Sequence, residues 1–438
     1  MNHIIELDLT GIAYGGAAIG RHEGRIVFVS YGIPGERVRA RITEERERFA
    51  RAEVVEVLTA SPHRVQPVCA HFGPGLCGGC HWQHIAYEAQ LAFKQEIVAD
   101  QLTRIGKFQA PPISSIVPSP SPWHYRTSAT FTTIPGAIPV LEVPDEEDSG
   151  AEGQPEDGAA DEIITLGFYS DDNSQIIPID ECHILHPALQ ELYDLLSLGE
   201  PVIERVRFQV GSDPEDRMII LHTADDLGPQ IEVDFPVSVN LLLSDNEPVN
   251  LIGSPQTHYT LLGRSFRVTA GGFFQVNLPV AGLLVEHVLR QLDLHGDETV
   301  LDLYSGVGLF TAFIAERAGL VISAESYPPA VTDADVNLGD LDNVDLIEGP
   351  VEGVLEDIEG PVDAVVVDPP RSGLAPVVIE HLLRLRPARL IYVSCDPATL
   401  ARDLQQLCRR DYHLIDVRPF DMFPQTFHIE CVATLVRK

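Results

Sequence analysis

Apolar residues in the last part of the chain, from about residue 269, recur first at helical and then at strand spacing. The pattern predicts helices at about 278–293 and 309–318, and short buried strands at 298–303, 320–325, 344–347, 362–368, 413–417 and 431–436. Strands that alternate with helices along a sequence form a largely parallel sheet covered by those helices. We therefore expect an α/β domain over residues 269–438.

One further strand in this domain ends in a cysteine. The run from Ile391 to Ser394 is apolar, Cys395 follows it, and Pro397 begins a predicted helix with leucines on one face. Ligands bind at this edge of open α/β sheets, so a thiol there is a candidate nucleophile, which attacks as the thiolate. The alternative is a small buried hydrophobe, because cysteine is among the most buried residue types.

Residues 1–58 have the pattern of a small β-barrel, with glycines between short strands. The strand predicted from Arg37 alternates with period two, so that Arg37, Arg39 and Arg41 share one face. An arginine face suits the phosphate backbone of a nucleic acid. The alternative is a solvated surface, in which the glutamates that follow balance these arginines.

Residues 59–268 are predicted to form a central domain of mixed helix and strand. The pattern predicts a helix at about 87–105 and strands at 125–132, 163–169, 205–210 and 218–222. Residues 141–162 interrupt this domain with ten acidic residues and no basic ones. Such a composition is typical of a disordered surface loop.

Length and composition limit the classes of protein. The 438 residues leave room for two or three domains. Because the chain has neither a long apolar run nor an N-terminal signal pattern, we expect no membrane association and a cytoplasmic location. The net charge of −35 opposes nucleic-acid binding at face value, since phosphates need local positive charge. The charge is uneven along the chain, however, so this argument is weak.

Three cysteines, Cys69, Cys77 and Cys80, lie within twelve residues of glycine-rich sequence, and Cys182 is the best remaining candidate for a fourth ligand. Four thiolates can hold zinc or an iron–sulfur cluster, and the spacing does not separate the two. Three nearby histidines leave a mixed zinc site open, and unliganded thiols are the remaining alternative. The odd total of seven cysteines does not indicate a disulfide scaffold.

A glycine turn, Gly306 to Thr311, follows the first strand of the C-terminal domain. The dinucleotide fingerprint has glycine or alanine where threonine stands here, which disfavours NAD. Glu325 ends the next strand, where a carboxylate can accept both hydroxyls of a ribose. This arrangement suits S-adenosylmethionine, which has a ribose and no phosphates. Asp368 ends a further strand in Asp-Pro-Pro-Arg371, whose prolines restrict the backbone.

Four stretches together resemble the RNA 5-methyluridine methyltransferase family. They are VLDLYSGVG at 300–308, DPPRSGL at 368–374, YVSCDPATLARDL at 392–404 and DMFPQTFHIE at 421–430. Residues 1–58 resemble the TRAM barrel of that family, so that the resemblance covers nearly the whole chain. It implies a Rossmann-like class I methyltransferase domain at the C-terminus, an N-terminal TRAM β-barrel and a central α+β domain.

The resemblance also implies an activity, the methylation of uridine C5 in RNA. By motif match, Cys395 adds to C6 of the uracil, and Glu430 removes the C5 proton after methyl transfer. The implied cofactor positions are Gln275, Tyr304, Gly306, Glu325 and Asp368, and Arg371 is matched loosely to the uracil or a phosphate. The four cysteines resemble the ligands of a [4Fe-4S] cluster, with zinc as the alternative.

The resemblance further implies RNA as the partner, 23S-type ribosomal RNA before transfer RNA, with the target uridine flipped out or in a loop. We expect a monomer with no obligate protein partner. The chain departs from the family at Asp396, where asparagine is usual, and this extra negative charge should disfavour the Cys395 thiolate. Two alternatives remain: an amino-group methyltransferase, which would not need Cys395, and a non-catalytic RNA-binding protein.

Overall fold

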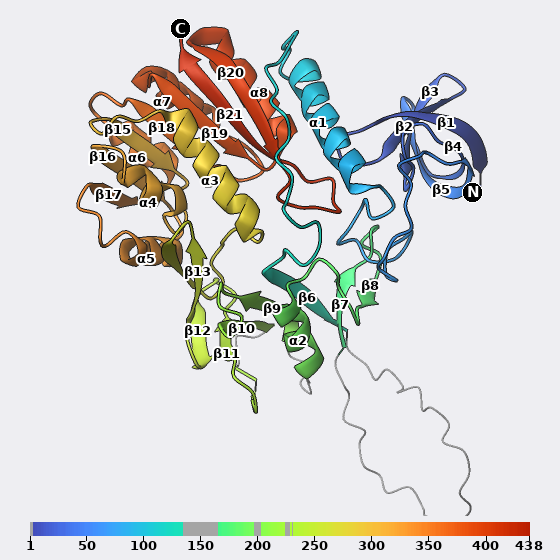
Figure 1. The fold of residues 1–438 in the computed structure, drawn as a ribbon, viewed down its shortest axis with the longest axis horizontal. Coiled ribbons are helices and arrows are strands. Elements are labelled where there is room, and N and C mark those ends of the chain that lie inside the picture. Colours follow the sequence, from blue (N-terminus) through green and yellow to red (C-terminus); the bar gives the residue numbers. More distant parts are fainter. Residues whose placement is uncertain (1–2, 135–164, 197–202, 224–227, 230) are drawn as a thin grey trace, which may run out of the picture.

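The structure, a computed structural model, describes residues 3–134, 165–196, 203–223, 228–229 and 231–438. The acidic segment predicted at 141–162 lies outside these residues. Figure 1 shows a small barrel, a central sheet and a C-terminal sheet covered by helices, with the helix α1 (Tyr87–Arg104) between the barrel and the C-terminal sheet. No helix among the described residues is long and apolar enough to cross a membrane.

The N-terminal strands close into a barrel in the order β1-β2-β3-β5-β4. They are β1 (Ile4–Ile12), β2 (Ala18–His22), β3 (Arg25–Ser30), β4 (Arg37–Glu45) and β5 (Phe49–Thr59). Alternate residues of β1 and β4 are buried, among them Leu7 and Val38, which confirms the period-two pattern of the sequence.

The central sheet has seven strands in the order β12-β11-β10-β9-β6-β7-β8, and a hairpin, β13-β14, follows it. The strands are β6 (Ser128–Ile134), β7 (Thr165–Tyr169), β8 (Ile176–Pro178), β9 (Ile203–Val210), β10 (Arg217–Thr223), β11 (Ser238–Leu242), β12 (Pro248–Ile252), β13 (Gln256–Leu261) and β14 (Arg264–Thr269). The helix α2 (Pro187–Leu195) packs through Leu189 and Leu192 on one face of this sheet, against Val206 and Phe208 of β9.

The C-terminal sheet has the order β17-β16-β15-β18-β19-β21-β20, and only β21 runs antiparallel to its neighbours. Its strands are β15 (Thr299–Leu303), β16 (Leu320–Glu325), β17 (Val344–Glu348), β18 (Ala364–Val367), β19 (Arg389–Ser394), β20 (Tyr412–Phe420) and β21 (Glu430–Arg437). The covering helices are α3 (Leu278–Leu292), α4 (Leu309–Ala315), α5 (Pro328–Asn337), α6 (Val351–Asp357), α7 (Pro376–Leu385) and α8 (Pro397–Arg410). This is the class I methyltransferase fold. The strand order reverses at β15, and ligands bind at such a switch point.

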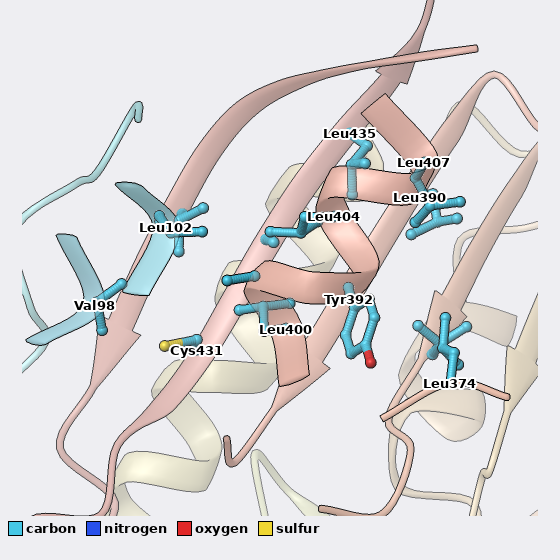
Figure 2. Packing of buried hydrophobic residues seen from close by; sticks show 14 of the residues in the cluster. Val98, Leu102, Leu374, Leu390, Tyr392, Leu400, Leu404, Leu407, Cys431 and Leu435 are labelled. Carbon is cyan, nitrogen blue, oxygen red and sulfur yellow. The ribbon is translucent and has the colours of Figure 1, made fainter. Parts of the chain in front are cut away.

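The helix α8, which follows Cys395, is held by a large apolar cluster. Figure 2 shows its three leucines, Leu400, Leu404 and Leu407, facing side chains of β19 and β21, with Val98 and Leu102 of α1 beside them. All three leucines are fully buried. Because burying a leucine side chain contributes roughly 1.5–3 kcal/mol, this packing fixes the strand-to-helix junction that carries the cysteine.

The sequence pattern located the elements of the C-terminal core but missed several others. The structure adds β8, β11 to β14, α2, α5, α6 and α7 to the predicted set. The missed strands are short. In α5 the buried residues have helical spacing, but two of them, Asp333 and Asn337, are polar, so the sequence shows no apolar period there. The predicted domain boundaries at residues 58 and 268 stay a prediction; β5 ends at Thr59 and β14 at Thr269.

Candidate functional site

Three predicted site residues meet at the carboxyl edge of the C-terminal sheet. Cys395 follows β19, Asp368 follows β18, and Glu430 begins β21. Ser394 pairs with Cys431 across the β19–β21 ladder, which places Glu430 beside Cys395 although 34 residues separate them in the sequence. The antiparallel insertion of β21 next to β19 therefore puts a carboxyl group next to the thiol.

The two carboxyl groups form a buried pair. Burial raises the pKa of Asp368 to about 7, and burial together with the Asp368 charge raises the pKa of Glu430 well above its ordinary value. Both effects disfavour a second negative charge in the site. At neutral pH the pair therefore retains a proton, and one member is available as a base.

The Cys395 thiol lies in an unfavourable field for ionisation. Burial raises its pKa to about 12, the charges of Glu430 and Asp368 add to this, Arg371 opposes it, and Asp396 contributes a smaller rise. Protonation of the carboxyl pair removes part of this repulsion. The resting site therefore holds a thiol, and forming the thiolate requires a loss of negative charge nearby or positive charge from outside.

Glu325 and the glycine turn lie together at the neighbouring strand ends. The Gly306 amide donates to Glu325 Oε2 at 2.9 Å, and the amides of Ser326 and Tyr327 donate to Oε1 at 2.7 and 2.8 Å. Gly306 has a φ of +57°, and Tyr304 before it has +64°, a conformation that costs a non-glycine residue free energy. These bonds fix the carboxylate at the strand end, where its remaining lone pairs can accept the hydroxyls of a ribose.

The structure explains the threonine in the third position of the turn. Thr311 Oγ1 donates to Asp302 Oδ2 at 2.5 Å and contacts Ser323 Oγ at 3.1 Å. Asp302 is fully buried, its pKa is raised to about 7 by burial, and its Oδ1 has no hydrogen-bond partner among the described residues. The sequence analysis assigned no role to Asp302. A charged residue inside the apolar strand β15, just before the glycine turn, could have indicated that it takes part in the site.

Gln275 lies between β14 and α3, in a segment that joins the central sheet to the site. Asn277 caps α3 by accepting from Val280, and its Nδ2 donates to Ser119 Oγ at 3.1 Å and to Met422 O at 3.2 Å. Gln275 itself is buried, whereas Phe273, two residues earlier, is 68% exposed. An aromatic ring this exposed beside the site offers a stacking surface that the sequence analysis did not identify.

The Asp396 carboxylate accepts three hydrogen bonds that the sequence analysis did not predict. Its Oδ1 accepts from the amides of Ala398 and Thr399 at 2.9 and 3.0 Å, which caps α8. Its Oδ2 accepts a hydrogen bond from the hydroxyl of Tyr14, a residue of the barrel. Burial and this carboxylate raise the pKa of Tyr14 to about 12, while Arg371 lowers it, so the barrel reaches the residue next to Cys395.

A buried ion pair holds the loop that leads to Glu430. Lys94 Nζ of α1 donates to Asp421 Oδ1 at 2.5 Å and to Phe423 O at 3.0 Å, and both charged side chains are fully buried. Tyr87 OH donates to Asp421 Oδ2 at 2.7 Å. Asp421, the first residue of the DMFPQTFHIE stretch, therefore attaches this loop to the helix α1.

The four predicted metal-ligating cysteines line a single cavity of about 240 Å³, together with His71 and Arg126. Burial raises the pKa of all four thiols, that of Cys77 to about 11. Among the described residues no group of three or more His, Cys, Asp or Glu side chains is already arranged to hold a metal ion. The donor set nevertheless fits a four-thiolate group, because a cation is what would keep these buried thiols deprotonated.

The three predicted barrel arginines lie on the exposed face of β4, but the barrel balances their charge. Their ion pairs are Arg37–Glu6 at 3.6 Å, Arg39–Glu6 at 2.9 Å, Arg39–Glu56 at 2.7 Å and Arg41–Glu53 at 3.5 Å. Exposed pairs of this kind are weak, so a phosphate can compete for them. The assignment of these arginines to RNA stays a prediction.

The switch-point geometry, the acidic strand end and the carboxyl edge define a class I methyltransferase, a class that uses S-adenosylmethionine. The family model described as tRNA (Uracil-5-)-methyltransferase matches residues 261–438, and a TRAM domain model matches residues 2–55. An uncharacterized RNA methyltransferase of Streptomyces avermitilis is 36% identical over 445 residues, covering 99% of this chain and 98% of the relative. A second, from Streptomyces coelicolor, is 37% identical over 440 residues, covering 98% and 92%.

The protein belongs to the uracil-5-methyltransferase family of S-adenosylmethionine-dependent RNA methyltransferases and carries a TRAM domain. Among solved structures, the Pyrococcus abyssi tRNA (uracil-54, C5)-methyltransferase in complex with S-adenosyl-L-homocysteine aligns over 99% of this chain and 100% of that one. The TM-score is 0.70 at 24% sequence identity, which shows a shared fold over all three parts of the molecule.

Proposed function

We propose that the protein methylates C5 of uridine in RNA through a covalent adduct between Cys395 and C6 of the uracil. The observation that carries this proposal is the pairing of β19 with β21, which sets a thiol beside a buried carboxyl group that itself lies close to a second carboxyl, Asp368. An amino-group methyltransferase has no use for such a pair.

The site residues would act in sequence. The Cys395 thiolate forms a bond to C6, and the C5–C6 π electrons move toward the O4 carbonyl, which makes C5 nucleophilic. S-adenosylmethionine, when bound, supplies the methyl group that C5 takes. Glu430 then accepts the C5 proton, the C6–S bond breaks, and the electron pair returns to the sulfur as thiolate.

The cofactor would bind between the glycine turn and β18. Glu325 would accept the ribose hydroxyls, and Tyr304, Gly306, Asp368 and Gln275 would line the rest of this site. Arg371 is exposed and forms no ion pair with a described carboxylate, so it suits the uracil or an adjacent phosphate. Since Cys395 and Glu430 lie below the protein surface, the target uridine has to leave any base pair to reach them.

We propose ribosomal RNA as the first candidate substrate and transfer RNA as the second, modified by a monomer in the cytoplasm. The test is tritium release from unmodified RNA labelled at uridine C5, with S-adenosylmethionine present and each RNA assayed separately. We expect release by the wild type and none by Cys395→Ala, while Cys408→Ala, a cysteine far along α8, retains wild-type release. Methyl transfer without tritium release would contradict C5 chemistry, and equal release by Cys395→Ala would contradict the adduct.

We also propose that Cys69, Cys77, Cys80 and Cys182 hold a [4Fe-4S] cluster. The support is that all four thiols face one cavity and are buried enough to need a cation. Protein purified without oxygen is expected to contain about four iron and four sulfide per chain with broad visible absorbance. Cys182→Ser is expected to lose most of the iron, whereas Cys408→Ser keeps it; one zinc per chain and no sulfide in the wild type would establish the alternative.

The substitution Asp396→Asn is expected to shift the rising limb of the pH–rate profile to lower pH, by less than about one pH unit. Asp396 raises the pKa of Cys395, so its neutralisation lowers that pKa, and the thiolate is present at lower pH. Asparagine keeps the oxygen that caps α8, so the helix is preserved. Asp411→Asn, at the other end of α8, is the matched control; an unshifted limb in Asp396→Asn would contradict the expected charge effect.

A further inference from the structure

The face of the central sheet opposite α2 is partly covered, with Met218 and Ile220 fully buried on it, and it carries arginines whose charge the described residues do not balance. Along β9, Arg205 and Arg207 point to one face, while Val206 and Phe208 point to the other, where α2 covers them. Neither arginine forms an ion pair with a carboxylate of the described residues, and neither does Arg126, which lies two residues before β6 and also lines the cysteine cavity. In a chain with a net charge of −35, three neighbouring arginines without a carboxylate partner among the described residues are unusual.

These side chains form a continuous group. Arg207 Nε donates to Ser128 Oγ at 2.9 Å, and Arg126 Nε donates to Ser128 O at 2.9 Å, so both guanidinium groups reach the same residue. Arg205 lies opposite His222 in the β9–β10 ladder. Burial and the nearby charge of Arg126 lower the pKa of Arg207, which marks a partly buried cation next to a like charge.

The group also leads to the active site. Arg207 Nη2 donates to Gly272 O at 3.1 Å, directly before the exposed ring of Phe273. At the other end, Tyr125, the neighbour of Arg126 in the chain, donates from its hydroxyl to Pro424 O at 3.1 Å, in the loop before Glu430. The arginines therefore border the site between the stretch that contains Gln275 and the loop that contains Glu430.

Holding partly buried cations together without a counter-charge is unfavourable, because each loses hydration and repels its neighbours. A ligand anion would offset this cost. The barrel arginines differ, since each already has a carboxylate partner. His222 has its pKa lowered to about 4 by burial and by Arg205 and Arg207, so it offers a neutral hydrogen-bonding group at neutral pH and no charge.

We propose that Arg126, Arg205 and Arg207, with His222 beside them, form the binding surface for the phosphates of the RNA strand that flanks the target uridine. This proposal rests on the proposed function and adds to it the surface along which the RNA strand next to the target uridine binds. The negative phosphate backbone is the occupant that the charge of this face selects, and guanidinium groups bind phosphates through paired N–H donors.

Arg205→Gln is the most direct test, because Arg205 is exposed and its replacement leaves the fold intact. The probe is a fluorescein-labelled RNA hairpin with uridine in its loop, titrated by fluorescence anisotropy at several salt concentrations. We expect Arg205→Gln to weaken binding about 3- to 10-fold at low salt and to reduce the slope of log K against log salt by about one. Arg205→Glu should weaken binding further, because it replaces the positive charge with a negative one.

Arg410→Gln is the matched control, because it removes the same charge at the exposed far end of α8 and should bind RNA as the wild type does. The proposed surface would be overturned if Arg205→Gln had the same RNA affinity and the same salt dependence of binding as Arg410→Gln. It would also be overturned if only the barrel variant Arg39→Gln lost affinity for RNA. Wild-type protein that releases tritium from RNA keeps the proposed function even if the surface fails, whereas absence of RNA binding by the wild type would overturn both.

Discussion

Glu430→Gln is expected to lower kcat about 10²- to 10⁴-fold, the usual contribution of a general base. Glutamine has nearly the same shape but does not accept the C5 proton, so elimination of the thiolate would be blocked after methyl transfer. A covalent complex between protein and RNA should therefore accumulate. Burial and the Asp368 charge raise the pKa of Glu430, so its carboxylate binds a proton more strongly than an exposed glutamate does.

The measurement combines tritium release with a denaturing gel that separates free protein from its adduct with labelled RNA. We expect Glu430→Gln to show a slowly migrating band that the double variant with Cys395→Ala lacks. Glu356→Gln, on the exposed side of α6, should behave as the wild type. Wild-type tritium release by Glu430→Gln would show that another group removes the proton, and Asp368 would be the next residue to replace.

Lys94→Met is expected to lower the free energy of unfolding by about 3–5 kcal/mol, because it leaves the buried carboxylate of Asp421 without its cation. Lys94 and Asp421 are both fully buried, and only Tyr87 would still donate to this carboxylate. The double variant with Asp421→Asn should recover part of the loss, since it removes the unpaired charge. The loop before Glu430 should loosen, and kcat should fall as well.

Urea unfolding followed by tryptophan fluorescence measures this effect, because the ring of Trp82 is buried in the folded protein and becomes exposed on unfolding. Lys107→Met, at an exposed lysine, is the control and should unfold as the wild type does. A loss of less than about 1 kcal/mol in Lys94→Met would mean that the pair contributes no more than an exposed one. An equal loss in both the single and the double variant would exclude the unpaired charge as the cause.

The C-terminal fold could be predicted from sequence because its signals are local. The strand before Cys395, the helix after it and the glycine turn at Gly306 each depend on neighbouring residues, and the structure places them as the pattern predicts. The same applies to the alternation in β4 that aligns Arg37, Arg39 and Arg41. The prediction that Cys395 and Glu430 act together depended on the family resemblance, because no local sequence pattern indicates that β21 inserts beside β19.

The sequence by itself determined the strands of the C-terminal sheet, the helices α3, α4 and α8, the barrel, the glycine turn and the position of the candidate nucleophile. Only the tertiary structure decided which charges are balanced. The β4 arginines are paired with glutamates from β1 and β5, whereas the arginines of β9 find no carboxylate among the described residues. Contacts such as Tyr14 to Asp396 and Lys94 to Asp421 join residues more than 300 positions apart, and they exist because hydrophobic packing brings those elements together.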